Sequence, residues 1–227
     1  MKQYDVIIIG AATAGSFFAR RMAEGGHSVL VIEKLSPDTL GTRLDIFHVA
    51  KGDFDRYGLP QPGPGDPDWA FEFHDSAACS PTGKYPKRTR ASIVGMHMQP
   101  YIARLNRWAE EAGARIEYGA EFTGFLFDQG RVAGVRYTKD GRERHAAARI
   151  VADCSGIPSA ARRALPEGYG VENFEITPSD MFYVILRYAR FRDPKDYIGD
   201  KGTLGWTYYK TWLAPDADPA GGIIGIG

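Results

Sequence analysis

A glycine-containing segment near the N-terminus has the spacing of a phosphate-binding turn. Gly10 and Gly15 enclose four residues, and Glu33 follows about twenty residues later. Backbone N–H groups at the start of a helix bind phosphate oxygens, and a carboxylate at the end of the next strand accepts hydrogen bonds from ribose hydroxyls. The spacing predicts a site for the ADP portion of a dinucleotide, formed by Gly10, Ala12, Thr13, Ala14, Gly15 and Glu33.

The residues around this turn predict a strand–helix–strand unit. Residues 5–9 are mostly β-branched, which is typical of a buried parallel strand. Apolar residues in 16–24 recur at helical spacing, and Gly25 follows as a C-terminal cap. Residues 28–33 form the second strand. In such a unit the first glycine permits the tight turn, and the last lets the helix pack closely on the strand.

Two residues refine the choice of ligand. Ala12 occupies the middle position of the G-x-G-x-x-G motif, so a methyl group stands where a pyrophosphate passes, and we expect some loss of affinity. The charge of Glu33 repels a 2′-phosphate, which favours FAD or NAD over NADP. The alternative is an ordinary βαβ unit, which either has no ligand or binds another nucleotide.

Further elements are expected after this first strand–helix–strand unit. Residues 100–112 predict an amphipathic helix, and residues 121–127 and 132–137 predict a strand pair. A further strand is expected around His145. Residues 148–156 read as a buried strand that ends in Asp-x-Ser-Gly.

This order of elements resembles the flavin-dependent oxidoreductases of the p-hydroxybenzoate hydroxylase and glutathione reductase type, and within them the geranylgeranyl reductase branch. The resemblance implies FAD as the cofactor, and it covers most of residues 1–165. The segments that carry it are Asp5–Gly15, Glu33-Lys34, the Glu-Glu-Ala-Gly-Ala run at 110–114, and Ile150–Ser159.

The resemblance also implies further FAD contacts. Asp153, Ser155 and Gly156 are expected on the turn beside the cofactor, and Lys34 is expected next to Glu33. Backbone groups around Phe122 would contact the adenine.

Two more positions are expected on the flavin side of the site. Gln99 would lie near the pyrophosphate, where related enzymes often carry an arginine. Arg43, which follows a turn after the second strand, would reach a phosphate or the flavin.

The family also carries a Gly-Asp motif late in the chain that binds the ribityl group and the pyrophosphate. Gly52-Asp53, Gly65-Asp66 and Gly199-Asp200 are present, but none stands between a buried strand and a helix. We therefore expect an N-terminal portion of a longer protein or an unusually short relative, with weakened affinity for FAD.

The expected fold class is α/β: a Rossmann-like FAD-binding domain with a parallel sheet, plus a largely antiparallel and incomplete β substrate domain. The FAD-binding domain is expected at residues 1–57 and 93–168. The substrate domain is expected at residues 58–92 and 169–227. The segment 181–191 and the aromatic run near Trp206 read as strands of this second domain. Its aromatic side chains would line an apolar pocket or simply pack the sheet.

Charge and composition exclude several classes of function. Lys plus Arg and Asp plus Glu each number 28, so no basic footprint supports nucleic-acid binding. His48, His74 and His97 lack the spacing of metal ligands, and no metal is expected. No signal peptide or transmembrane run is evident, which favours a cytoplasmic protein, with peripheral membrane contact left open.

The leading functional hypothesis is a geranylgeranyl-reductase-like enzyme that moves electrons through FAD to a small apolar or aromatic substrate. NAD(P)H is a candidate electron donor. A flavin-dependent aromatic monooxygenase or halogenase is the first alternative, and a non-catalytic dinucleotide-binding fragment is the second. The sequence nominates no catalytic acid or base and does not fix the oligomeric state.

Overall fold

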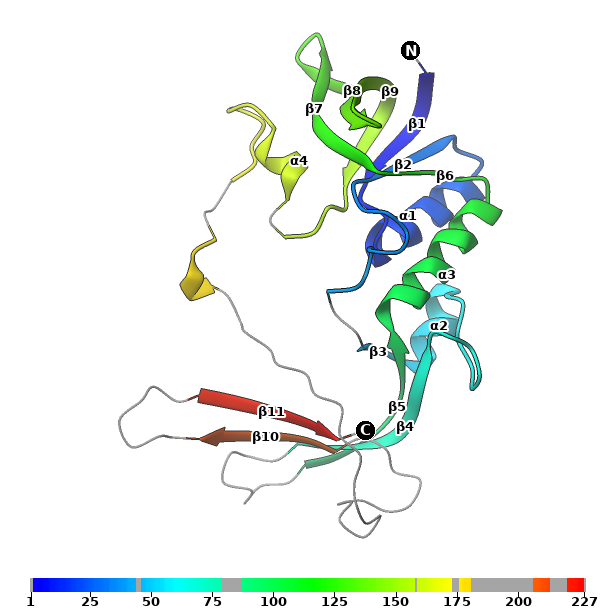
Figure 1. Ribbon diagram of the computed structural model, residues 1–227, viewed down its shortest axis with the longest axis vertical. Helices are drawn as coiled ribbons and strands as arrows, with labels where there is room; N and C mark the ends of the chain where they lie inside the picture. The colour runs from blue at the N-terminus through cyan, green and yellow to red at the C-terminus, as the bar shows by residue number, and fades with distance from the viewer. Residues whose placement is uncertain are drawn as a thin grey trace. The chain divides into compact units, whose positions relative to one another are not determined.

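The chain folds into two compact units (Figure 1). The first comprises Met1–Asp45 and Met98–Tyr183, and the second comprises Ile46–His97 and Val184–Gly227. The computed structural model describes residues 2–43, 46–78, 87–157, 159–172, 176–180, 206–212 and 220–226.

The first unit is built on a six-stranded sheet with the order β6-β2-β1-β9-β8-β7. β1 pairs in parallel with β2 and β9, β2 pairs in parallel with β6, and β7, β8 and β9 form an antiparallel meander. The strands are β1 (Lys2–Ile9), β2 (Val29–Glu33), β6 (Arg115–Tyr118), β7 (Ala120–Asp128), β8 (Arg131–Lys139) and β9 (Arg142–Asp153).

Both faces of the parallel strands are buried, which is why their sequences are continuous apolar runs. On one face, Val6, Ile8 and Val31 pack with residues of helices α1 (Thr13–Glu24) and α3 (Met98–Glu111). On the other face, Ile7, Ile9, Leu30 and Ile32 pack with Val135, Tyr137 and Ala146 of the meander. The parallel strands β1 and β2 are therefore packed on both faces.

Strand β9 corrects one expectation. The sequence suggested one strand around His145 and a separate strand from residue 148, but the structure has a single strand of 12 residues. Its first half pairs with β8 and its second half pairs with β1. Because one strand serves two partners, its two halves carry different hydrophobic patterns, and these patterns read as two elements.

The second unit is largely antiparallel, as expected. Its three-stranded sheet has the order β3-β5-β4, and β10 and β11 form a separate antiparallel pair. The strand expected at 181–191 lies outside the described residues. The elements of this unit are β3 (Ile46–Ala50), α2 (Lys51–Tyr57), β4 (Trp69–Ala78), β5 (Lys87–His97), β10 (Trp206–Trp212) and β11 (Ala220–Ile226).

The boundaries of the two compact units differ from the expected domain boundaries. β3, α2 and residues 93–97 belong to the second unit, since β3 pairs with β5 from Ile46↔His97 to Ala50↔Ile93. The first unit also holds two short helices, α4 (Ala160–Arg163) and the 3₁₀ helix η1 (Pro178–Asp180). No helix in the described part of the chain is both long enough and apolar enough to cross a membrane.

Candidate cofactor site

The turn after β1 leaves no room for a side chain at either of its two glycines, Gly10 and Gly15. Gly10 has φ +102°, and a Cβ there would lie 2.5 Å from the Cys154 carbonyl oxygen. A Cβ on Gly15 would lie only 1.9 Å from the carbonyl oxygen of Gly10. The Cys154 N–H donates to the Ile9 carbonyl at 2.9 Å, which fixes the end of β9 against this turn. The two glycines are therefore required by close backbone approach, as the motif predicts.

The start of helix α1 has no side-chain cap among the described residues. Ala12 is the N-cap residue, and no side chain caps the helix there. The N–H groups of the first helical turn have no partner within a helix, and they carry the positive end of its dipole. Thr13, Ala14 and Gly15 supply these groups. Glycine positions closed to side chains and an uncapped helix start fit a pyrophosphate.

Ala12 has an ordinary extended conformation, with φ −77° and ψ −169°. Its methyl group packs against the core cluster on the helix side of the sheet. The middle position of the motif therefore does not depend on the conformational freedom of glycine here. The expected loss of FAD affinity therefore depends on the volume of the Ala12 methyl group and not on backbone strain.

Glu33 is held rigidly at the end of β2. Its Oε2 accepts a hydrogen bond from the Ala11 N–H at 2.8 Å, and its Oε1 accepts one from the Leu35 N–H at 2.8 Å. The residue is 6% exposed. Each carboxylate oxygen has two acceptor sites, so one site on each stays available for a ribose hydroxyl.

Ser16 and Asn106 form a buried polar pair behind the turn, which the sequence motifs do not indicate. The Ser16 hydroxyl lies 2.9 Å from the carbonyl oxygens of Ala11 and Ala12 and 2.5 Å from Oδ1 of Asn106. Ser16 is 0% exposed, and Asn106, on α3, is 3% exposed. The pair ties the phosphate-binding turn to α3. The available signal was a polar residue, Asn106, within the apolar face of that helix.

Tyr118, at the end of β6, lies close to this network. Burial, followed by the charge of Glu110, raises the pKa of Tyr118 to about 12, although a hydrogen bond with Asn106 acts in the opposite direction. The charge of Glu33 raises this pKa further. The phenol is therefore neutral at physiological pH.

The turn after β9 lies against the glycine turn, but its carboxylate is engaged locally. Asp153 Oδ1 accepts hydrogen bonds from the N–H of Ser155 at 3.0 Å and from its hydroxyl at 2.7 Å. Asp153 Oδ2 accepts from the Ser159 hydroxyl and from the Arg162 N–H, the latter at 3.2 Å. The Ser155 hydroxyl accepts from the Ala160 N–H at 3.2 Å. These contacts order the turn that carries Ser155 and Gly156, and they cap α4.

The loop after β2 contacts the start of α3. Gln99 Nε2 donates to the Asp38 carbonyl at 3.3 Å, and a Cβ on Gly41 would lie 3.0 Å from the Gln99 Cα. Lys34 and Arg43 are exposed on this loop. Gln99 is therefore positioned by the loop that carries Arg43.

Phe122 lies on β7, within the meander. Its side chain packs into the second core cluster and meets Phe125 edge-on, with ring centroids 5.0 Å apart. Within the described residues, no hydrogen bond or ion pair joins Phe122 or Arg43 to the glycine turn. The structure thus brings together the turn, Glu33 and residues 153–156, whereas for Phe122 and Arg43 the described residues show no direct contact of this kind.

Metal binding has no support in the described part of the chain, where no three histidine, cysteine, aspartate or glutamate side chains gather.

Comparison with known families decides between the dinucleotides. The family described as FAD binding domain matches residues 3–202. The chain belongs to the FAD binding domain family. FAD is therefore its cofactor, as the resemblance implied.

The curated relatives of this FAD-binding chain include two reductases with the following names. Digeranylgeranylglycerophospholipid reductase of Methanocella arvoryzae is 30% identical over 167 residues, which is 71% of this chain and 41% of the relative. Digeranylgeranylglycerophospholipid reductase 2 of Methanopyrus kandleri is 31% identical over 163 residues, or 71% of this chain and 39% of the relative. The chain spans about two fifths of the length of these relatives.

Solved structures share the fold. A geranylgeranyl bacteriochlorophyll reductase-like protein of Thermoplasma acidophilum has a TM-score of 0.66 at 20% identity, over 100% of this chain and 56% of that one. The myxobacterial chondrochloren halogenase, a FAD-dependent enzyme, has a TM-score of 0.62 at 23% identity, over 74% of this chain and 40% of that one. Both likenesses confirm the α/β fold.

Proposed function

We propose that this chain provides the FAD-binding portion of an FAD-dependent oxidoreductase of the geranylgeranyl reductase type. The observation that carries the proposal is the 30% identity to a digeranylgeranylglycerophospholipid reductase over 167 residues, a match that covers 71% of the chain. The closed glycine positions of the turn and the carboxylate of Glu33, held by the Ala11 N–H, support the proposal. The proposed substrate is a small apolar molecule with C=C bonds, of the isoprenoid class.

The proposal assigns a role to each residue of the turn and to Glu33. The N–H groups of Thr13, Ala14 and Gly15 would hold the pyrophosphate, and Glu33 would hold the ribose. Bound FAD supplies the electron transfer, while the chain fixes its position and surroundings.

The positions around this centre have supporting roles in the proposal. Ser155 and Gly156 line the site from β9, and Asp153 orders their turn. Gln99, Lys34 and Arg43 approach from the β2 loop and α3, and the backbone at Phe122 approaches the adenine. The first compact unit is then the FAD-binding domain, and the second contributes to the substrate side.

The setting of the reaction is also part of the proposal. NAD(P)H is the proposed electron donor, and the cytoplasm is the proposed compartment. An isoprenoid substrate attached to a lipid would require peripheral contact with a membrane surface.

The test is a reduction assay. Purified protein is loaded with FAD, reduced without oxygen and given a geranylgeranyl-bearing lipid, and products are analysed by mass spectrometry. The proposal expects a mass gain of one H₂ per reduced double bond. NAD(P)H-driven oxygen uptake triggered by an aromatic substrate would instead indicate a monooxygenase or halogenase. Tight FAD binding without any turnover would indicate a non-catalytic dinucleotide-binding portion.

A further inference from the structure

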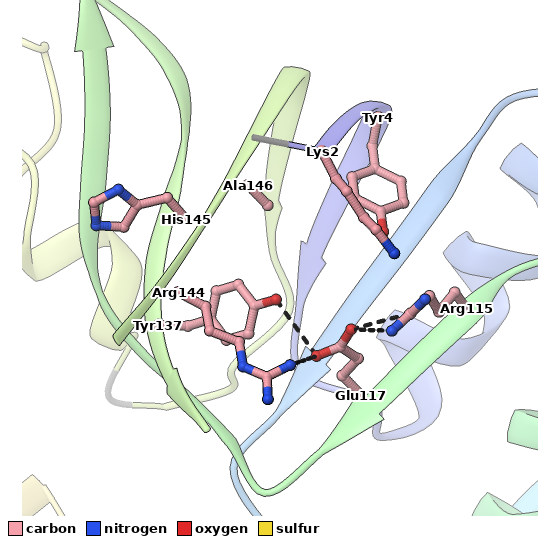
Figure 2. A pocket seen from close by; sticks show the side chains of 8 residues that line it. All are labelled: Lys2, Tyr4, Arg115, Glu117, Tyr137, Arg144, His145 and Ala146. Carbon is pink, nitrogen blue, oxygen red and sulfur yellow. Dashed lines mark hydrogen bonds and ion pairs between the residues drawn. The ribbon is translucent and has the colours of Figure 1, made fainter. Parts of the chain in front are cut away.

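A polar pocket lies at the amino end of β1 (Figure 2). Its volume is about 330 Å³, within the range of small-molecule sites. Tyr4, on its wall, precedes Gly10 by six residues, roughly 20 Å along a strand. The pocket is therefore far from the glycine turn, and the proposed function does not use it. The lining residues are Lys2, Tyr4, Arg115, Glu117, Tyr137, Arg144, His145 and Ala146.

The single carboxylate of the pocket is already satisfied. Glu117 Oε1 accepts two hydrogen bonds from Arg115, from Nε at 3.0 Å and from Nη2 at 2.6 Å. Its Oε2 accepts from the Tyr137 hydroxyl at 3.4 Å and lies 3.5 Å from Lys139 Nζ. Burial favours a raised pKa for Glu117, but the Arg115 hydrogen bond and the nearby cations outweigh it, so the pKa is lowered. The carboxylate is thus ionised and neutralised by its own neighbours.

Three other polar groups on the wall, those of Lys2, Tyr4 and Arg144, are donors with weak partners or none. Figure 2 shows the Lys2 ammonium and the Tyr4 hydroxyl pointing into the space beside Glu117. Among the described residues, neither group has a hydrogen-bond or ion-pair partner. Arg144 makes only long contacts, 3.9 Å to Glu117 and 3.5 Å to Asp140, whose side chain is 75% exposed.

The charge of the lining is accordingly unbalanced. Lys2, Arg115 and Arg144 are cations, and Glu117 is the one acid among the lining residues. His145 pairs with Glu143 at 2.8 Å, and Figure 2 shows its ring directed away from Glu117. A pocket with surplus donors and surplus positive charge is complementary to an anion that accepts several hydrogen bonds.

We infer that this pocket binds a small phosphate ester. A phosphate group offers three acceptor oxygens and up to two charges, which match Lys2, Tyr4 and Arg144 better than a single carboxylate would. The volume exceeds that of a bare phosphate ion, and the rings of Tyr4 and Tyr137 provide apolar surface for an organic part. The ester is either a free metabolite or the head group of a phospholipid.

The test is isothermal titration of the protein in the presence of saturating FAD, which keeps phosphate away from the glycine turn. The probes are glycerol 3-phosphate, inorganic phosphate, and vesicles of phosphatidylcholine with or without phosphatidic acid. Sodium chloride at equal ionic strength is the reference. We expect saturable binding of glycerol 3-phosphate, tighter than that of inorganic phosphate. Binding confined to phosphatidic acid vesicles would assign the same site to a lipid head group.

Variants locate the site. Lys2→Gln and Arg144→Gln each remove one charge-assisted donor and should weaken binding about tenfold, and Tyr4→Phe should weaken it less. Arg149→Gln is the matched control, because the Arg149 side chain is 77% exposed and does not line the pocket. Absence of binding beyond the sodium chloride reference would overturn the inference. Equal losses in Arg149→Gln and Lys2→Gln would also overturn it, because the attraction would then be non-specific. Urea unfolding of each variant checks that the fold is intact.

Discussion

At the scale of single residues, the geometry of the Glu33 side chain is the most direct support for a ribose-binding site. Two backbone N–H groups at 2.8 Å hold its carboxylate in one orientation. Such rigid placement limits the entropy lost when a ligand binds. The same contacts make the site sensitive to any substitution that exchanges an acceptor for a donor.

Glu33→Gln should weaken FAD binding by about tenfold to a hundredfold, because the amide NH₂ of glutamine would face a backbone N–H and a charged acceptor is lost. Titration of flavin fluorescence measures the change. Glu24→Gln is the matched control, since Glu24 is on the exposed surface of α1 and pairs with Arg20 and Arg21. Equal FAD affinity in wild type and Glu33→Gln would remove Glu33 from the site.

Ser16 and Asn106 predict a coupled effect on stability. Ser16→Ala leaves buried polar groups without a partner and should lower the free energy of unfolding by about 1–3 kcal/mol. The double variant Ser16→Ala/Asn106→Leu should cost less than the sum of the two single changes, because it removes both partners. Urea unfolding gives all three values. Additive losses would show that the 2.5 Å contact between the two side chains carries no energy of its own.

At the scale of elements, β6 and α3 meet around Tyr118, and this contact makes a prediction about alkaline pH. The pKa of Tyr118 is about 12 in the folded chain, above its ordinary value of 10.0. A raised folded-state pKa means that the unfolded chain ionises first. The stability that Tyr118 contributes is therefore complete below pH 10 and is lost as the pH rises through 12.

Tyr118→Phe should accordingly flatten the fall in the free energy of unfolding between pH 10 and 12. Urea unfolding at a series of alkaline pH values measures the slope. Tyr57→Phe, at a position that is 41% exposed, is the comparison and should leave the slope close to that of the wild type. The same steep fall in Tyr118→Phe and wild type would contradict the assignment.

At the scale of the whole molecule, some features were predictable from local sequence patterns. Others depend on contacts between residues far apart in the sequence and were not predictable. The glycine turn, the strand before it and Glu33 were predictable, because a phosphate-binding turn needs particular residues at a particular spacing. The continuous β9 was not, since its two halves pair with different strands. The Ser16–Asn106 pair joins residues 90 positions apart, and nothing local to either residue indicates the other. The pocket at the amino end of β1 likewise depends on four strands that meet only in the fold.

The central claim, that FAD binds at the turn after β1, is tested most directly by titrating FAD into wild type, Gly15→Ala and Ala12→Gly. A Cβ at position 15 would stand 1.9 Å from the Gly10 carbonyl oxygen, so even alanine must displace the turn. Circular dichroism and urea unfolding check that each variant is folded.

The account predicts that wild type binds one FAD per chain, that folded Gly15→Ala loses this binding, and that Ala12→Gly binds at least as tightly as wild type. The account would be contradicted by wild-type protein that is colourless after incubation with FAD and removal of the unbound cofactor. It would also be contradicted by folded Gly15→Ala that binds FAD as wild type does.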